Sequence, residues 1–236
     1  MSLKRYLRQI PYLGKKNQEK LKKAKIVIVG CGGLGTFASS MLVRMGLGYL
    51  TIIDKDKIEF SNLHRGCLFD EKDLGKFKAE VAKKKLKKIN SNCKIQIFKT
   101  SLKRENLNLL KESELILDCT DNIETRYLIN EFAIRNKIPW IYSAILGDEG
   151  MVSPFKGKPC LKCLIPNATQ EKLKTTKEIG IFPPIVNVIA SFSVSEALKI
   201  LLGNPEFGKL FYFNLKEPKF EVLKIKSTKN CPICSE

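Results

Sequence analysis

The chain has 236 residues, of which 44% are apolar and 28% charged, enough for one large α/β domain with a well-filled core or at most two small ones. Its formal net charge of +18 favours acidic partners such as nucleotides, nucleic acids or acidic proteins. The only histidine, His64, excludes a multi-histidine metal site and leaves little room for a His-based triad. We find no secretory signal, so we expect a soluble cytoplasmic protein.

The first half of the sequence alternates apolar runs with lysine-rich segments of helical spacing. It opens with a charged, broken amphipathic arm of residues 1–24. Apolar runs that end in glycine or in an acid are typical of buried parallel strands. The elements expected here are a strand Lys25–Gly30, a helix Thr36–Gly46, a strand Tyr49–Asp54, a helix Leu74–Asn90, and strands Cys93–Lys99 and Glu114–Asp118.

The second half continues this alternation and then changes to consecutive strands. The elements expected here are a helix Asn122–Asn136, strands Ile138–Ser143 and Gly150–Phe155, a polar loop Pro166–Phe182, a helix Pro184–Leu202, and strands Lys209–Asn214 and Lys219–Lys224. Residues 179–195 carry no ionisable side chain, but two prolines and three serines make them a poor membrane span. The fold class is therefore α/β: a Rossmann-like, mostly parallel sheet flanked by helices and continued by antiparallel strands.

Four of the eight cysteines form two C-x-x-C pairs. The pairs are Cys160 with Cys163, and Cys231 with Cys234. In a cytosolic chain, four such thiolates indicate one closed, structural zinc site that ties the C-terminal tail to the domain. The alternative is two redox-active or incidental pairs.

A glycine-rich turn predicts a nucleotide site. Gly30, Gly32 and Gly35 follow the first strand in the spacing G-x-G-x-x-G and lead into a helix, whose N-terminus suits a phosphate. Asp54 ends the second strand, where it is placed to bind ribose hydroxyls. This pattern alone fits ATP, NAD or FAD.

Charged residues after later strands favour ATP over a dinucleotide. Arg65 and Lys78 offer the positive charge that a polyphosphate needs, and Asp121 follows a buried strand, where its carboxylate is placed to hold Mg²⁺. A capping box formed by Asp121 and Glu124 at the start of the next helix is an equally good interpretation of the acid.

Taken together, the motifs resemble the ubiquitin-activating-enzyme-like adenylyltransferases of the MoeB/ThiF/HesA group. Six ordered motifs carry the resemblance across nearly the whole chain: Arg5-Tyr-Leu-Arg8-Gln9, Gly30-Cys-Gly-Gly-Leu-Gly35 with Asp54, Ser61-Asn-Leu-His-Arg65, Gly75-Lys-Phe-Lys78, Asp118-Cys-Thr-Asp-Asn122, and the two C-x-x-C pairs. The resemblance implies one adenylation domain, residues 25–236, with a nucleotide-binding half 25–145 and a carrier-binding and zinc half 146–236. It also implies a homodimer.

The family's activity sets the expected function. The resemblance implies that the chain uses ATP and Mg²⁺ to adenylate the C-terminal glycine of a small ubiquitin-like sulfur carrier, which then receives sulfur from a donor such as a cysteine desulfurase or rhodanese. The nucleotide-binding residues would be Gly30, Gly32, Gly33, Gly35, Asp54, Asn62, Arg65, Lys78, Asp121 and Asn122. The catalytic residues would be Arg8, Arg65, Lys78 and Asp121, with Arg8 acting in the partner subunit's site.

Two positions depart from the family's pattern. Gly66 stands where a glutamine is usual, and Thr176 stands where many relatives have a cysteine. Cys67 and Cys119 are expected to be core or pocket-wall thiols rather than replacements. Three other readings stay open: a tRNA-modifying relative that adenylates a nucleoside carboxylate and would suit the basic charge, a NAD- or FAD-dependent oxidoreductase, and a noncatalytic adaptor.

Overall fold

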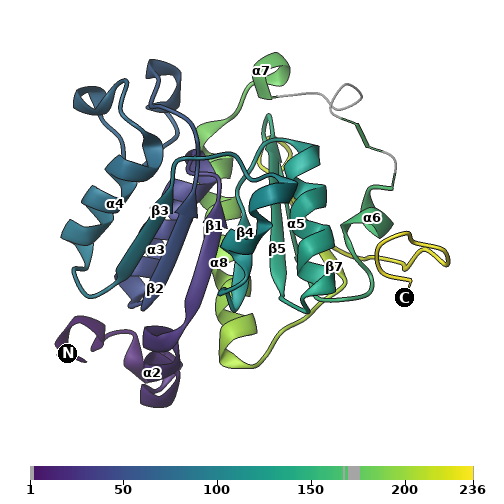
Figure 1. The fold of residues 1–236 in the computed structure, drawn as a ribbon, viewed down its shortest axis with the longest axis horizontal. Coiled ribbons are helices and arrows are strands. Elements are labelled where there is room, and N and C mark those ends of the chain that lie inside the picture. Colours follow the sequence, from purple (N-terminus) through teal and green to yellow (C-terminus); the bar gives the residue numbers. More distant parts are fainter. Residues whose placement is uncertain (1–2, 167, 170–175, 236) are drawn as a thin grey trace.

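A single eight-stranded sheet organises the chain in the computed structural model, which describes residues 3–166, 168–169 and 176–235 (Figure 1). The strand order is β3-β2-β1-β4-β5-β6-β7-β8. The strands are β1 Lys25–Val29, β2 Tyr49–Ile53, β3 Lys94–Phe98, β4 Leu115–Asp118, β5 Trp140–Leu146, β6 Glu149–Phe155, β7 Lys209–Asn214 and β8 Lys219–Lys224. Strands β1 to β5 pair in parallel and β5 to β8 antiparallel, so the predicted fold class is confirmed.

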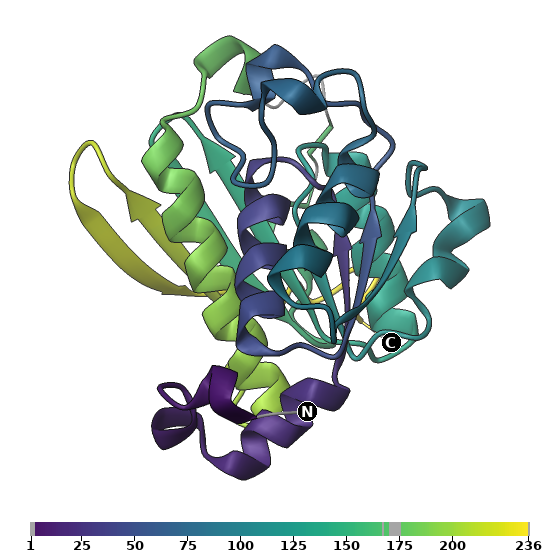
Figure 2. The ribbon, with the colours of Figure 1, turned by 90° about the vertical axis from the view of Figure 1, so that its left-hand side faces the viewer.

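Helices cover both faces of this sheet. They are α1 Ile10–Leu13, α2 Lys15–Lys23, α3 Gly33–Met45, α4 Lys78–Ile89, α5 Ile123–Arg135, α6 Leu161–Leu164, α7 Thr176–Ile179 and α8 Pro183–Leu202. The 3-10 turns are η1 Leu3–Tyr6, η2 Phe60–Asn62, η3 Glu71–Asp73 and η4 Arg104–Leu110. Helices α3, α4 and α8 pack on one face, and α5 with α6 and η4 on the other (Figure 2).

The alternation of side chains in β1 explains the two layers. Ile26 and Ile28 point into the core formed with α3, α4 and α8. Val27 and Val29 point into the opposite core, formed with α5. A strand covered on both faces needs apolar residues at consecutive positions, because neighbouring side chains point to opposite sides. This is why the apolar runs in the sequence predicted buried strands.

The last helix, α8, is part of this core. By length and composition it is the one described helix that is apolar enough to cross a membrane. In the structure it packs along α3 and against β5 and β6, and it buries Ile185, Ile189 and Val194. The predicted buried helix is confirmed, and it begins at Pro183.

Two predicted helix starts were wrong. The helix expected from Leu74 begins only at Lys78, because Gly75 has a φ of +76° and Phe77 is extended. The helix expected from Thr36 begins at Gly33, so the second half of the glycine motif belongs to the first turn of α3. Part of the predicted loop Pro166–Phe182 is helical, as α7, and its residues 167 and 170–175 lie outside the described residues.

Candidate active site

The sheet order creates a topological switch point between β1 and β4. From β1 the chain proceeds outward to β2 and β3, whereas β4 lies on the other side of β1 and continues to β5. In open α/β sheets of this kind, ligands bind beyond the carboxyl ends of the strands at such a point. The loops after β1 and β4 carry the glycine motif and Asp121, so the predicted nucleotide residues converge at this edge.

Glycines are required here because backbones approach closely. Gly30 has a φ of +93°, and a Cβ on it would lie 2.5 Å from the carbonyl oxygen of Cys119 in the loop after β4. A Cβ on Gly35 would collide with the carbonyl oxygen of Gly30. Gly33 packs against Arg65 and Val186. Gly32, in contrast, has no heavy atom near its Cβ position among the described residues, which leaves the turn open for a phosphate.

Asp54 lies next to this turn, just past the end of β2. One of its carboxylate oxygens accepts a hydrogen bond from the backbone N–H of Cys31 at 2.6 Å, and the other from that of Asp56 at 2.7 Å. Burial raises the pKa of the Asp54 carboxyl, and these two N–H groups and the charge of Lys78 partly offset that effect. The carboxylate is therefore fixed in direction beside the glycine turn, as ribose binding requires.

The predicted basic residues lie around the same turn. Lys78 begins α4 and is nearly buried, and its ammonium lies 3.3 Å from the Asp56 carboxylate. Arg65 packs against Gly33 and donates a hydrogen bond to the Ser61 carbonyl at 2.6 Å. The Asn62 side chain accepts a hydrogen bond from the backbone N–H of Glu59. The structure thus brings two cations to the turn, as a polyphosphate site needs.

Asp121 is not the cap of α5. That position belongs to Asn122, whose side-chain oxygen accepts a hydrogen bond from the Thr125 backbone N–H at 2.8 Å. Asp121 is exposed, and among the described residues nothing forms a hydrogen bond or ion pair with its carboxylate. A free carboxylate in the loop that packs against the glycine turn suits the donor chemistry of Mg²⁺. The capping interpretation of Asp121 is therefore wrong, and the metal interpretation remains a prediction.

Arg8 lies near the opposite end of the sheet, where the parallel strands begin. The arm around it packs where the strands begin: the Gln9 side chain donates a hydrogen bond to the carbonyl of Met45, and Tyr6 packs against Gly46 (Figure 1). The glycine turn and Asp121 lie where the strands end. Within one chain, Arg8 is thus not part of the site formed by Arg65, Lys78 and Asp121.

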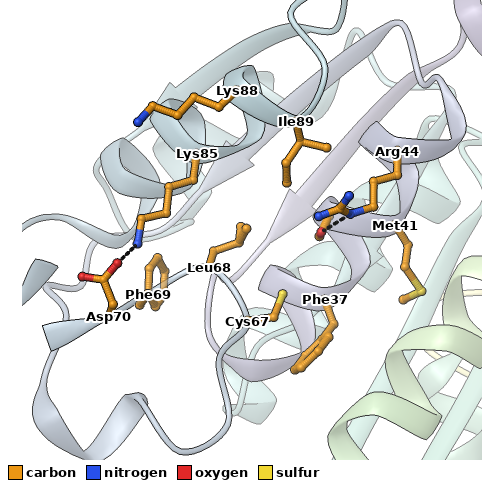
Figure 3. A pocket seen from close by; sticks show the side chains of 11 residues that line it. Phe37, Met41, Arg44, Cys67, Leu68, Phe69, Asp70, Lys85, Lys88 and Ile89 are labelled. Carbon is orange, nitrogen blue, oxygen red and sulfur yellow. Dashed lines mark hydrogen bonds and ion pairs between the residues drawn. The ribbon is translucent and has the colours of Figure 1, made fainter. Parts of the chain in front are cut away.

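A pocket of about 530 Å³ lies apart from these residues, between α3, α4 and the segment 67–70 (Figure 3). Its apolar wall includes Phe37 and Ile89, and Arg44, Lys85 and Lys88 also line it. Cys67 is an exposed thiol in its wall, as the sequence suggested. None of the predicted nucleotide residues lines this pocket, so we do not assign it to the nucleotide.

The four paired cysteines come together as predicted. Their sulfur atoms all lie within 4.8 Å of one another, with Cys160 and Cys231 at 3.6 Å and Cys163 and Cys234 at 3.5 Å. Four thiolates around one Zn²⁺ have Zn–S distances of about 2.3 Å, which places the sulfurs roughly this far apart. Burial raises the pKa of Cys163, but hydrogen bonds, including one from the Thr228 backbone N–H, bring it to about 7. The cluster therefore fits a closed structural zinc site.

Sequence reasoning missed one charged pair at the site. Asp118 is fully buried at the end of β4, and Arg126 of α5 is nearly buried beside it. Burial raises the pKa of the Asp118 carboxyl, and the charge of Arg126 and hydrogen bonds from Thr120 oppose the shift. The two residues are eight positions apart in different elements, so no local spacing pattern signals the pair.

Comparisons with known proteins identify the family of the chain. The ThiF family matches residues 5–233. The chain is 35% identical to the sulfur carrier protein adenylyltransferase of Thermus thermophilus, covering 99% of this chain and 91% of that protein. It is also 35% identical to the molybdopterin-synthase adenylyltransferase of Escherichia coli, covering 98% and 96%. A crystal structure of E. coli MccB with AMPCPP and MccA superposes with a TM-score of 0.88 at 25% identity, covering 100% of this chain and 75% of that one. The chain belongs to the ThiF family.

Proposed function

We propose that this chain is an ATP-dependent adenylyltransferase that activates the C-terminal glycine carboxylate of a small ubiquitin-like sulfur-carrier protein. The observation that carries the proposal is the convergence of the glycine turn, Arg65, Lys78 and Asp121 at the switch point of the sheet. The names of the two relatives support the same reaction, and that of the Thermus thermophilus protein also names a sulfur carrier as the substrate.

The chemistry that this arrangement supports is a single displacement at phosphorus. A carboxylate oxygen of the carrier attacks the α-phosphorus of ATP, a new P–O bond forms, and the bond to the β-phosphate breaks to release pyrophosphate. Arg65 and Lys78 would bind the phosphates and stabilise the charge that develops on them. Asp121 would hold Mg²⁺, which neutralises phosphate charge when bound. No protein nucleophile is needed, because positioning and charge stabilisation suffice.

The other hypotheses explain less of the chain. A NAD- or FAD-dependent oxidoreductase accounts for the glycine turn and Asp54 but not for Lys78 or the four cysteines. A noncatalytic adaptor leaves the free Asp121 carboxylate without a purpose. A tRNA-modifying relative would use the same site, and the charge of +18 suits a nucleic acid. The experiment must therefore compare a carrier with tRNA.

ATP–pyrophosphate exchange tests the proposal. We expect exchange when a carrier ending in Gly-Gly is added with Mg²⁺, and none with the same carrier lacking its last glycine. Exchange driven by tRNA and not by the carrier would favour the tRNA-modifying relative. The pathway that the carrier serves would follow from which carrier is active. We further propose a cytoplasmic enzyme whose product passes to a separate sulfur donor, such as a cysteine desulfurase or rhodanese.

We also propose a homodimer in which Arg8 completes the partner's site. Its support is the position of the N-terminal arm that carries Arg8: it packs near the end of the sheet where the parallel strands begin, whereas Asp121 follows the carboxyl end of β4 (Figure 1). Mixing inactive Arg8→Ala chains with inactive Asp121→Ala chains should restore part of the exchange activity, because a hybrid dimer contains one site with both residues.

The control for this prediction is each variant mixed with itself, after proof of subunit exchange. Two inactive variants that stay inactive although their subunits have exchanged would show that Arg8 does not act in trans. Arg5→Ala is a matched substitution, since Arg5 lies in the same arm and hydrogen-bonds the Ile89 carbonyl instead. The Arg5→Ala variant should be active in exchange without mixing with another variant.

A further prediction concerns Thr176, the first residue of α7. A threonine hydroxyl is a far weaker nucleophile than a thiolate at neutral pH. We therefore expect no covalent carrier–enzyme conjugate after incubation with ATP, as judged on denaturing gels without reductant. A thiol-sensitive conjugate lost in Cys67→Ser or Cys119→Ser would contradict this expectation and identify the cysteine involved.

A further inference from the structure

A buried ion pair lies directly beneath the loop that carries Asp121. The carboxylate of Asp118 and the guanidinium of Arg126 are 3.3 Å apart, in an ionic contact that lacks hydrogen-bond alignment. Removing two charges from water costs several kcal/mol per ion, so such a pair persists only where further hydrogen bonds hold it. The partners that supply those bonds show what the pair is attached to.

Those partners fix Thr120, the residue before Asp121. The second oxygen of Asp118 accepts hydrogen bonds from the Thr120 backbone N–H at 2.9 Å and from its hydroxyl at 2.6 Å. Arg126 donates to the Thr120 carbonyl at 2.6 Å. Every polar group of Thr120 is thus engaged by the ion pair. On the other side of Asp121, the side chain of Asn122 caps α5.

The same arginine connects this loop to the next strand. Its guanidinium also donates to the carbonyl of Ser143 in β5 at 3.3 Å and lies 5.0 Å from the ring centre of Tyr142. The Ser143 hydroxyl in turn hydrogen-bonds that of Ser193 in α8 at 2.8 Å. Meanwhile the backbone of Cys119 and Thr120 supports Gly30 of the nucleotide turn. Arg126 therefore joins the Asp121 loop to β5, and the loop that it holds packs against the glycine turn.

We propose that Arg126 is a positioning residue that holds the exposed carboxylate of Asp121 where metal-bound ATP meets it. The proposal rests on the proposed function. Asp121 has no partner of its own among the residues that the structure describes, so its direction is set by its two neighbours. One neighbour is a helix cap, and the other is fixed by Arg126 and Asp118. Loss of the arginine should therefore loosen Asp121 without altering Arg65 or Lys78.

Arg126→Lys separates positioning from charge balance. Lysine keeps a positive charge opposite Asp118 but offers one ammonium instead of a planar fork, so it cannot face Asp118 and also hold the Thr120 and Ser143 carbonyls. Thr120→Val is a second, milder variant, which removes one hydrogen bond and leaves the ion pair intact. Arg135→Lys is the matched control on the same helix, because Arg135 is exposed and its ion-pair partner among the described residues is Glu131.

The readout is equilibrium binding of a non-hydrolysable ATP analogue, measured with Mg²⁺ and again with a chelator. We expect Arg126→Lys to weaken binding about tenfold with Mg²⁺ and by less than about threefold without it, since small misplacements of a positioned group have effects of this size or larger. Thr120→Val should show a smaller loss of the same kind, and Arg135→Lys none. Thermal unfolding confirms that each variant is folded.

Combining Arg126→Lys with Asp121→Asn tests whether the arginine acts through Asp121. If it does, the double variant should bind Mg²⁺–analogue no more weakly than Asp121→Asn alone. Equal weakening with and without Mg²⁺, or additive losses in the double variant, would show that Arg126 only stabilises the fold. If Arg126→Lys does not fold, the same comparison with Thr120→Val tests whether the contacts of Arg126 position Asp121 or only stabilise the fold. Absence of metal-dependent binding in the unaltered protein would instead contradict the proposed function itself.

Discussion

Replacing Asp121 with alanine is expected to lower carrier-dependent ATP–pyrophosphate exchange by about two orders of magnitude or more, as is typical when a metal ligand or charge-stabilising group is lost. The reason is the position of this carboxylate beside the glycine turn, exposed and without a partner among the described residues. The melting temperature should stay nearly unchanged, because Asn122 and not Asp121 caps α5.

Two comparisons sharpen this result. Glu124→Ala changes another exposed acid in the first turn of the same helix and should leave exchange close to that of the unaltered protein. Raising the Mg²⁺ concentration should recover part of the activity of Asp121→Asn if the residue acts through the metal. Full exchange activity in Asp121→Ala would refute the metal-binding role.

The second large effect expected is a loss of thermal stability when the cysteine cluster loses its metal. Protein purified without chelators should contain one zinc per chain, held by Cys160, Cys163, Cys231 and Cys234. Chelation, or Cys234→Ser, should lower the melting temperature by roughly 8–16 °C. The reason is that loss of a structural metal is among the most destabilising single changes and should lower the free energy of unfolding by about 4 kcal/mol. In a chain of this size 1 kcal/mol corresponds to about 2–4 °C.

The matched control for the zinc prediction is Cys67→Ser. This thiol is exposed and lies in the pocket between α3 and α4, away from the cluster. The substitution should change neither the zinc content nor the melting temperature. The tail should become accessible to proteases in Cys234→Ser, while nucleotide affinity persists, because no predicted nucleotide residue belongs to the cluster. Metal analysis that finds no zinc would contradict the predicted structural role of these cysteines.

Much of the fold was predictable because burial on both faces leaves a strong signal in the sequence. The runs that became β1 and β4 are apolar at consecutive positions, as is typical of a strand between two helix layers. The two C-x-x-C pairs carried equally specific information about their meeting in space. Features of this kind can be predicted from the sequence because they depend on residue types at fixed spacing.

Other features depended on contacts that no spacing pattern reveals. The helix at Lys78 starts late because Gly75 adopts a left-handed conformation, which a periodic lysine pattern does not show. The cap at Asn122 rather than Asp121 became clear only from the geometry of the hydrogen bond to Thr125. Arg126 was unremarkable in the sequence, because its importance comes from a buried partner at the end of another strand.

Trapping the activated carrier with hydroxylamine is the most direct measurement of the central claim. An acyl-adenylate reacts with hydroxylamine to give a hydroxamate at the adenylated carboxyl group, which mass spectrometry locates. With the chain, ATP and Mg²⁺, we predict conversion of the carrier's terminal glycine to the hydroxamate, no conversion when ATP is omitted, and strongly slowed conversion with Asp121→Ala. An unmodified terminal glycine in the presence of a chain that binds ATP and Mg²⁺ would contradict the proposed function.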